Sequence, residues 1–147
     1  LMDYAGLDNP ADMLGRSFRE VLRGRTPDGC RQSVYYRSWM NRTQQGVPAH
    51  YGIRTKTRRL IFFYGLALDA RRAVPEWGPT EPGFELYDLE KDPLETTNVV
   101  HDPAYADAVR ELKAALLDLK QQVGDHDEGY PELMAVRRDV WPESISG

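Results

Sequence analysis

The clearest pattern of hydrophobic and polar positions lies between residues 49 and 64, which read AHYGIRTKTRRLIFFY. Apolar or β-branched residues alternate with polar ones over 50–58, and a period of two is typical of a half-buried β-strand. After a basic turn at 57–59, residues 60–64 form an apolar run rich in β-forming residues. Two such runs with a short connection predict an antiparallel hairpin, whose second strand should lie centrally with both faces covered.

Two further segments alternate in the same way, one before the hairpin and one after it. The predicted strands cover about residues 32–40, 49–57, 60–65 and 84–89. Between the third and fourth strands, residues 65–82 contain three prolines and are predicted to form a long loop.

A long helix is predicted over 103–123. Asp102 and Pro103 are residue types typical of a helix start, and Gly124 is typical of a helix end. Apolar residues recur between them at spacings of 4, 3, 4, 3 and 4, which places them on one stripe: Tyr105, Val109, Leu112, Leu116, Leu119 and Val123. The predicted fold class is α+β, a four-stranded antiparallel sheet with one long C-terminal helix packed across a face.

Composition narrows the class of protein and its partners. The chain has 147 residues, of which 41% are hydrophobic and 29% charged, as expected of one globular domain. A net charge of −4 from 19 basic and 23 acidic residues does not favour nucleic acid or an anionic membrane as partner. No run of roughly 18–20 apolar residues predicts a membrane span. The single cysteine, Cys30, allows no internal disulfide, so cysteine usage does not indicate an oxidising or a reducing compartment.

Neither the C-terminal segment nor the histidines predict a metal site. Residues 125–147 are polar and have no clear period, so we assign them no regular structure. Asp125, Asp127 and Glu128 lack the further oxygen ligands and the glycine of a calcium loop, and we interpret them as a solvated acidic turn. The three histidines are far apart in the sequence, so no metal site is predicted.

The hairpin also carries a family resemblance. HYGIRTKTRRLIFFY and, further along, FELYDLEKDPLETTNVVHDPAY resemble the C-terminal region of the sulfatases, the arylsulfatase-like branch of the alkaline phosphatase superfamily, and YYRSWM at 35–40 fits the same family. The resemblance covers roughly residues 1–124. It implies that 1–31 are a remnant of a preceding large domain with a linker, that 32–124 are the sulfatase C-terminal subdomain, and that 125–147 are a C-terminal tail. A chain that begins at Leu1 is consistent with a fragment.

The resemblance also implies where the chemistry lies. Sulfatases use a formylglycine, made from a Cys or Ser in a C/S-x-P-x-R motif, beside a Ca²⁺ ion, and both belong to the larger N-terminal domain. Cys30 lacks the Pro and Arg at the required offsets. No catalytic residue and no cofactor are therefore expected in this chain, which is predicted to be inactive alone. Its expected partner is the catalytic N-terminal domain.

Four residues are candidates for substrate binding. His50 and Arg54 are predicted to share the polar face of the hairpin with Lys56 and Arg58, and an arginine fork matches anionic oxygens. Trp39 and Asn41, with Gln45, fall on the adjoining edge. The resemblance implies that such residues help to wall the pocket for a sulfated small molecule or glycan. A solvent-facing or domain-interface strand would explain the same charges.

The segment 88–98 admits two interpretations. Asp88, Asp92, Glu95 and Asn98 are compatible with a carboxylate site, but Asp and Asn also cap turns and helix ends. We favour the capping interpretation, because every polar residue of this set falls at a position where it can cap a turn or helix end.

Three hypotheses for the function follow. The first, which we adopt, is a sulfatase C-terminal subdomain that scaffolds the enzyme and helps to wall its substrate pocket. The second is a stand-alone binding module for sulfated or acidic glycans. The third is an interaction domain whose exposed sheet face docks another chain. Self-association of the isolated chain is expected under the first as well as the third.

Overall fold

The structure is a computed structural model that describes residues 2–8, 10, 13, 15–42, 46–68 and 78–141. It divides into two compact units, Leu1–Gln32 and Ser33–Gly147. The first unit contains a short 3₁₀ helix, η1 (Met2–Ala5), and one turn of α-helix, α1 (Arg19–Leu22). The second unit contains the sheet and the two longer helices. Among the described residues, no helix is both long and apolar enough to cross a membrane.

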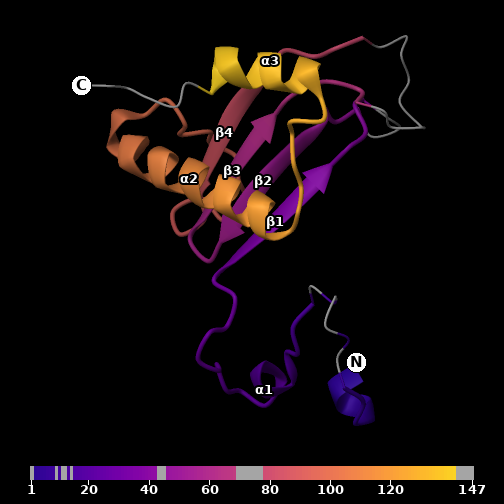
Figure 1. The fold of residues 1–147 in the computed structure, drawn as a ribbon. Coiled ribbons are helices and arrows are strands. Elements are labelled where there is room, and N and C mark those ends of the chain that lie inside the picture. Colours follow the sequence, from indigo (N-terminus) through magenta and orange to yellow (C-terminus); the bar gives the residue numbers. More distant parts are fainter. Residues whose placement is uncertain are drawn as a thin grey trace. The chain divides into compact units, whose positions relative to one another are not determined.

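The second unit is built on a four-stranded antiparallel sheet with the strand order β1-β2-β3-β4 (Figure 1). The strands are β1 (Ser33–Ser38), β2 (His50–Thr55), β3 (Arg58–Phe63) and β4 (Gly83–Asp88). Each strand pairs with the next one along the chain, so the connections are simple. The predicted α+β fold is confirmed, and the run 60–64 contributes the central strand β3 as expected.

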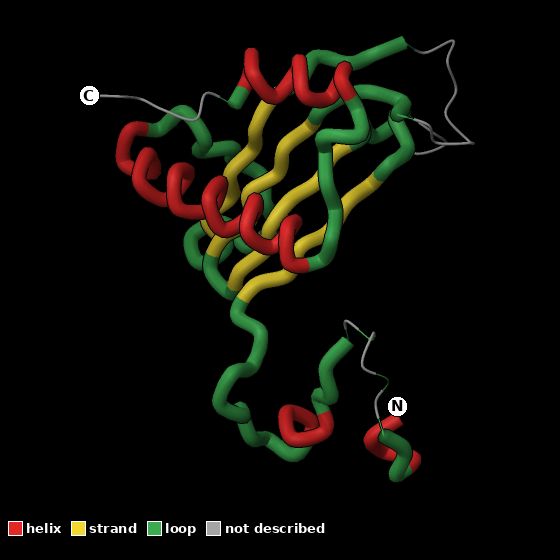
Figure 2. Tube along the Cα trace, in the orientation of Figure 1, coloured by secondary structure: helices red, strands yellow, loops and turns green. Residues whose placement is uncertain are grey.

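The helices cover one face of this sheet. Figure 2 shows α2 (Ala106–Gln122) and α3 (Pro131–Val140) on the same side of the strands. The core lies between them and the sheet, and its fully or almost fully buried members include Tyr51, Ile53, Leu60, Phe62, Leu86, Leu116, Leu133 and Trp141. At about 1.5–3 kcal/mol for each fully buried aliphatic side chain, this apolar layer is the main force that holds the helices on the sheet.

The pairing of the strands shows which of their residues lie on the side of the sheet opposite to the core. We call the side under the helices the helix face and the opposite side the open face. Because side chains alternate along a strand, the pairs Tyr36↔Gly52 and Arg54↔Arg59 lie opposite to the core pair Tyr51↔Phe62. The open face comprises Val34, Tyr36, Ser38, His50, Gly52, Arg54, Arg59, Ile61, Phe63, Glu85 and Tyr87.

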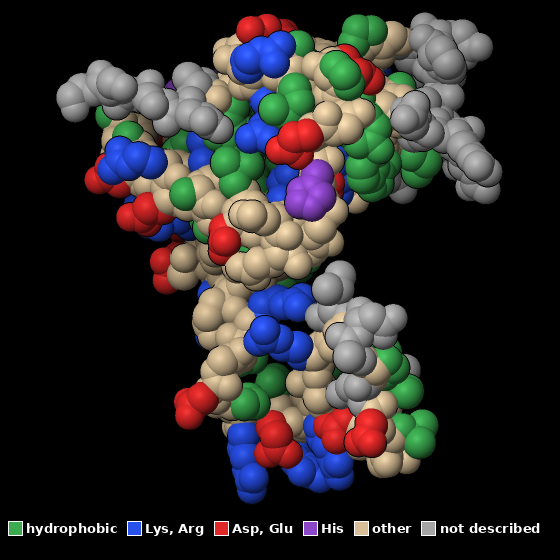
Figure 3. All heavy atoms as spheres, in the orientation of Figure 1, with side chains coloured by type: hydrophobic (Ala, Val, Ile, Leu, Met, Phe, Trp, Pro, Cys, Tyr) green, Lys and Arg blue, Asp and Glu red, His purple; other side chains and the backbone are tan. Residues whose placement is uncertain are grey.

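The long helix begins and ends as its sequence predicts. The Asp102 side chain accepts a hydrogen bond of 2.9 Å from the amide of Ala104, and a 3₁₀ turn, η3 (Pro103–Tyr105), leads into α2. Gly124 follows the helix with a φ of 71°, a left-handed conformation that glycine adopts without strain. Figure 3, viewed from the helix side, shows acidic and basic side chains over the outer surface of α2, as expected of an amphipathic helix.

Two expectations differ from the structure. Residues 131–140, to which we assign no regular structure from the sequence, form α3, and its Leu133 is fully buried. A helix of ten residues shows fewer than three turns of its apolar stripe, so its period is hard to detect. The predicted loop 65–82 lies in large part outside the described residues, as does Gln45.

The segment 88–98 caps the edge strand β4, which supports the capping interpretation. Asn98 Oδ1 accepts from the amide of Leu86 at 2.9 Å, and the amide of Val99 donates to the Leu86 carbonyl at 2.9 Å. Asp92 accepts from the amides of Thr96 and Thr97 at 2.7 and 2.8 Å. The amide and carbonyl groups of Leu86 at the free edge of β4 are therefore hydrogen-bonded within the chain. This disfavours pairing of the edge with another strand.

Candidate functional site

His50 and Arg54 both lie on the open face, as the alternation predicts, but they do not form one compact site. They are four residues apart on β2, which at about 3.3 Å per residue separates their backbones by about 13 Å. The hydroxyl end of Tyr36 lies over Gly52 between them: a Cβ at Gly52 would come within 2.5 Å of the Tyr36 Oη atom. The open face therefore has two ends with different chemistry.

The Arg54 end is organised by one carboxylate. Glu95 accepts from Arg54 Nη1 at 2.8 Å and from Arg59 Nη1 at 2.6 Å. Arg59 Nε also donates to the Tyr36 hydroxyl at 2.8 Å. Burial raises the pKa of Glu95, but the hydrogen bonds from the two arginines outweigh it and hold the pKa below its usual value. Glu95 has a φ of 56°, uncommon for a non-glycine residue, so the turn places this carboxylate at a conformational cost.

The arginine that shares this end with Arg54 is Arg59 and not Arg58, which corrects the prediction. The hairpin turns at 56–57, so the alternation that runs along β2 does not continue into β3. Arg58 pairs with Asp88 across β3 and β4, in phase with the core residues Leu60 and Phe62. Arg58 thus belongs to the other side of the sheet from His50 and Arg54.

The His50 end is less charged and more aromatic. His50 Nδ1 lies 2.8 Å from the carbonyl oxygen of Pro48. A carbonyl can only accept, so Nδ1 carries a proton and donates it to Pro48. The ring packs between Tyr36 and Phe63, at centroid distances of 6.1 and 5.2 Å. The imidazole is therefore held in one position.

A hollow of about 490 Å³ lies at this end, where β2 begins, β3 ends and β4 begins. Its lining combines apolar groups with two carboxylates, and includes Val47, Pro48, Phe63, Glu81, Gly83 and Glu85. His50 borders it through its contacts with Pro48 and Phe63. Tyr87 donates a 2.9 Å hydrogen bond to Glu85 Oε2, and burial together with this carboxylate raises the pKa of Tyr87 to about 12.

Trp39 and Asn41 are not in the lining of the hollow. Asn41 is 2% exposed, and its amide is occupied in holding loops together: Oδ1 accepts from the amide of Ala49 at 3.0 Å, and Nδ2 donates to the Gly78 carbonyl at 3.1 Å. The Arg37 guanidinium lies over the Trp39 ring at 3.5 Å, and the Tyr130 ring, next to α3, packs against Trp39 at a tilt of 57°. The structure thus gives both residues packing partners, and their role in substrate binding stays a prediction.

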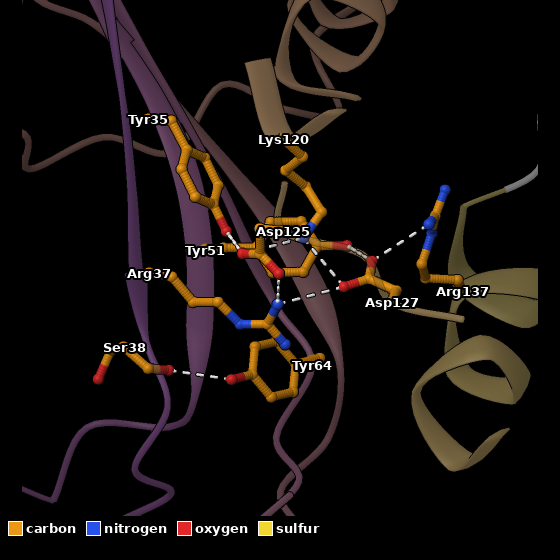
Figure 4. Close-up of polar contacts among 9 residues, drawn as sticks. All are labelled: Tyr35, Arg37, Ser38, Tyr51, Tyr64, Lys120, Asp125, Asp127 and Arg137. Atoms are coloured by element: carbon orange, nitrogen blue, oxygen red, sulfur yellow. Dashed lines mark hydrogen bonds and ion pairs between the residues drawn. The ribbon is translucent and has the colours of Figure 1, made fainter. Parts of the chain in front are cut away.

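The helix side holds a buried polar cluster that the sequence does not suggest (Figure 4). Asp127 has a side-chain exposure of 0% and accepts from Lys120 at 2.9 Å, Tyr51 at 2.9 Å and Arg137 at 3.1 Å. Asp125 accepts from Arg37 at 2.5 Å and from the Tyr35 hydroxyl. The expectation of a solvated acidic turn is therefore wrong for Asp127. Basic side chains from β1, α2 and α3 compensate the two buried carboxylates.

The pKa shifts in this cluster follow from burial. Burial lowers the pKa of Lys120, although Asp127 and Asp125 oppose the shift. Burial also raises the pKa of Tyr51 and Tyr35, and the neighbouring carboxylates add to this effect. Tyr51 and Tyr35 are thus kept neutral and serve as hydrogen-bond donors. Every carboxylate oxygen in the cluster is occupied by donors, so we interpret it as a structural tie between β1, α2 and α3.

Over the described part of the chain, no three His, Cys, Asp or Glu side chains come together to hold a metal ion. Cys30 lies in the first unit as a free, partly exposed thiol.

Comparison with known proteins gives the context of this site. A family model described as "N-sulphoglucosamine sulphohydrolase, C-terminal" matches residues 1–122. A curated protein named N-acetylglucosamine-6-O-sulfatase, from Bacteroides thetaiotaomicron, is 32% identical over 140 residues. The match covers 94% of this chain but 23% of that protein.

Solved structures also match this chain. One protein, solved in complex with its substrate D-glucosamine-2-N,6-O-disulfate, matches with a TM-score of 0.72 and 31% identity over 88% of this chain and 24% of its own. A 2-O GAG sulfatase matches with a TM-score of 0.64 and 26% identity, over 87% of this chain and 24% of its own. The chain therefore spans about a quarter of the length of the relatives that it matches.

Proposed function

Because this chain belongs to the family of N-sulphoglucosamine sulphohydrolase C-terminal regions, and so is a sulfatase C-terminal domain, we propose that it scaffolds the catalytic part of the enzyme through its open face. In this proposal the chain supplies no nucleophile and no metal ligand. The formylglycine and the Ca²⁺ expected of a sulfatase belong to the part that the relatives have beyond this chain.

The observation that carries the proposal is the contrast between the two faces of the sheet. The helix face is closed by α2, α3 and the buried cluster. The open face has no helix over it among the described elements, and it holds aromatic and charged side chains in fixed positions. A surface with pre-arranged arginines and aromatic rings is typical of a protein interface, where both residue types are enriched.

The two ends of the open face receive different roles in this proposal. Arg54, whose side chain is 49% exposed, is steadied by Glu95 and keeps further N–H groups for a partner. We assign this end to the contact with the catalytic domain. His50 and the hollow beside it form the end that helps to wall the substrate pocket, because a hollow is where a ligand can be enclosed.

The relatives suggest the class of substrate. One is named N-acetylglucosamine-6-O-sulfatase, and another was solved with the disulfated D-glucosamine described above. We therefore propose that the complete enzyme hydrolyses sulfate esters of amino sugars. The arrangement around His50 is compatible with a sugar, since it joins an aromatic ring, Phe63, to hydrogen-bonding groups.

The experiment compares the complete enzyme with the isolated chain. The isolated chain should not turn over an aryl sulfate; turnover that is lost in Cys30→Ala would overturn the proposal. In the complete enzyme, His50→Ala should raise KM for a 6-sulfated amino sugar about fivefold, since one hydrogen bond contributes about 1 kcal/mol. His101→Ala is the matched control, because His101 is an exposed histidine that lies outside the strands of the open face. An unchanged KM in His50→Ala would contradict the role in the pocket.

A further inference from the structure

We propose that the hollow beside His50 is an acceptor subsite: it binds the hydroxyl groups of an unsulfated sugar unit and disfavours sulfate. The inference rests on the proposed function, in which this end of the open face walls the substrate pocket, and it specifies what the wall recognises.

The first argument is the fixed position of His50. Its Nδ1–H is committed to the Pro48 carbonyl at 2.8 Å, so Nε2 is the ring nitrogen left for a ligand. The ring contacts with Tyr36 and Phe63 hold the imidazole in place. A sugar hydroxyl both donates and accepts, so it pairs with Nε2 whether or not this nitrogen carries a proton, whereas a sulfate, which only accepts, requires the proton.

The second argument is the charge of the hollow. The ionisable side chains in its lining are Glu81 and Glu85, both carboxylates. Glu85 is oriented by the hydrogen bond from Tyr87 to Oε2, which leaves Oε1 for a ligand. Two carboxylates accept hydrogen bonds from hydroxyl groups and repel a sulfate. Both charged groups in the lining are thus acceptors.

The third argument is the shape and polarity of the remaining lining. Val47, Pro48 and Phe63 contribute apolar surface, and Val47 is 43% exposed. A sugar ring has an apolar C–H side and a rim of hydroxyl groups, so it suits a site with apolar walls and a few polar groups. A volume of about 490 Å³ lies within the range of small-molecule sites, about 300–1,000 Å³.

The position of the arginines supports the same assignment. Arg54 and Arg59, the cationic residues of the open face, lie at its other end and share Glu95. About 13 Å of strand separates Arg54 from His50. A sulfate attracted to this face would therefore be drawn to the arginine end, away from the hollow.

The test is an NMR titration of the chain with two probes, N-acetylglucosamine and sodium sulfate, at equal millimolar concentrations. The sugar should shift the amide signals of Phe63 and Gly83 in a saturable way, and sulfate should leave them in place. His50→Phe, which keeps an aromatic ring but removes Nε2, should weaken the sugar binding about fivefold. Val34→Ala should bind the sugar as the unaltered chain does.

Two outcomes would overturn the inference: no saturable shift with the sugar, or a shift of the Phe63 and Gly83 signals by sulfate. Either outcome would leave the proposed scaffold role intact, because that role is measured by catalysis in the complete enzyme. Conversely, the sugar could bind to the chain while His50→Ala leaves KM of the complete enzyme unchanged. This result would support the subsite but contradict its place in the substrate pocket.

Discussion

Lys120 donates a hydrogen bond of 2.9 Å to Asp127, and the exposed fractions of the two side chains are 4% and 0%. The pair joins the last turn of α2 to the segment before α3. Neither charge could be buried alone, since an unpaired buried charge costs several kcal/mol. Asp127 also accepts from Tyr51 in β2 and from Arg137 in α3. One carboxylate therefore determines how both helices meet the sheet.

Asp127→Asn should destabilise the protein strongly. The substitution removes the charge that compensates Lys120 and Arg137, and loss of one partner from a buried pair costs about 3–5 kcal/mol. The free energy of unfolding from urea denaturation should fall by that amount.

Asp107→Asn is the matched control. Asp107 pairs with Arg110 at 2.6 Å, but the side chain is 82% exposed. The same chemical change should cost less than about 1 kcal/mol there. Equal effects at the two positions would contradict a structural role for the buried cluster.

Gly52→Ala should disturb the open face. A Cβ at this position would lie 2.5 Å from the Leu60 carbonyl oxygen and 2.5 Å from the Tyr36 hydroxyl. Because the carbonyl belongs to the neighbouring strand, relief requires movement of the backbone, and overpacking of this kind costs about 1–3 kcal/mol. Thermal unfolding would measure the loss. Gly83→Ala is the control, since nothing lies within 4 Å of its added Cβ; an equal loss there would show that the close approach of Tyr36 is not the cause.

Glu95 should make stability depend on pH in the acid range. Its pKa in the folded state is lower than in the unfolded chain, where a glutamate has a pKa of about 4.3. The stabilisation is therefore fully present above that pH and is lost as the pH falls through the folded value. Glu95→Gln should remove this part of the pH dependence, measured as unfolding free energy against pH, while Glu111→Gln on the exposed surface of α2 should retain it. Identical profiles for the two variants would contradict the ion pairs of Glu95.

Much of the fold follows from patterns that the sequence displays directly. The period of two around Ile53, the stripe through Leu112 and Leu116, and the start at Asp102 each depend on local physics, and all three are present in the structure. The confirmed family match covers residues 1–122, which include this hairpin.

The faces of the sheet were harder to predict, because they depend on where the hairpin turns. With the turn at 56–57, Arg54 pairs with Arg59, so counting back from the turn would have found the second arginine. If the alternation of β2 is continued through the turn, it places Arg58 on the open face instead of Arg59. One misplaced residue reverses every side chain that follows.

The buried cluster could not be derived from local patterns. Lys120 lies four residues after Leu116 on the buried side of α2, which is the one signal that a charge was to be buried there. The partners of Asp127 come from β1, β2 and α3, up to 90 residues away in the chain. Only the tertiary structure brings them together.

The central claim is that the open face meets the catalytic part of a sulfatase, and oxidative footprinting of side chains tests it most directly. The experiment compares the isolated chain with the complete enzyme. We predict that Tyr36, His50, Phe63 and Tyr87 are oxidised more slowly in the complete enzyme, while Tyr130, next to α3, reacts at the same rate in both. Unchanged rates on the open face, or protection confined to Tyr130, would contradict the account.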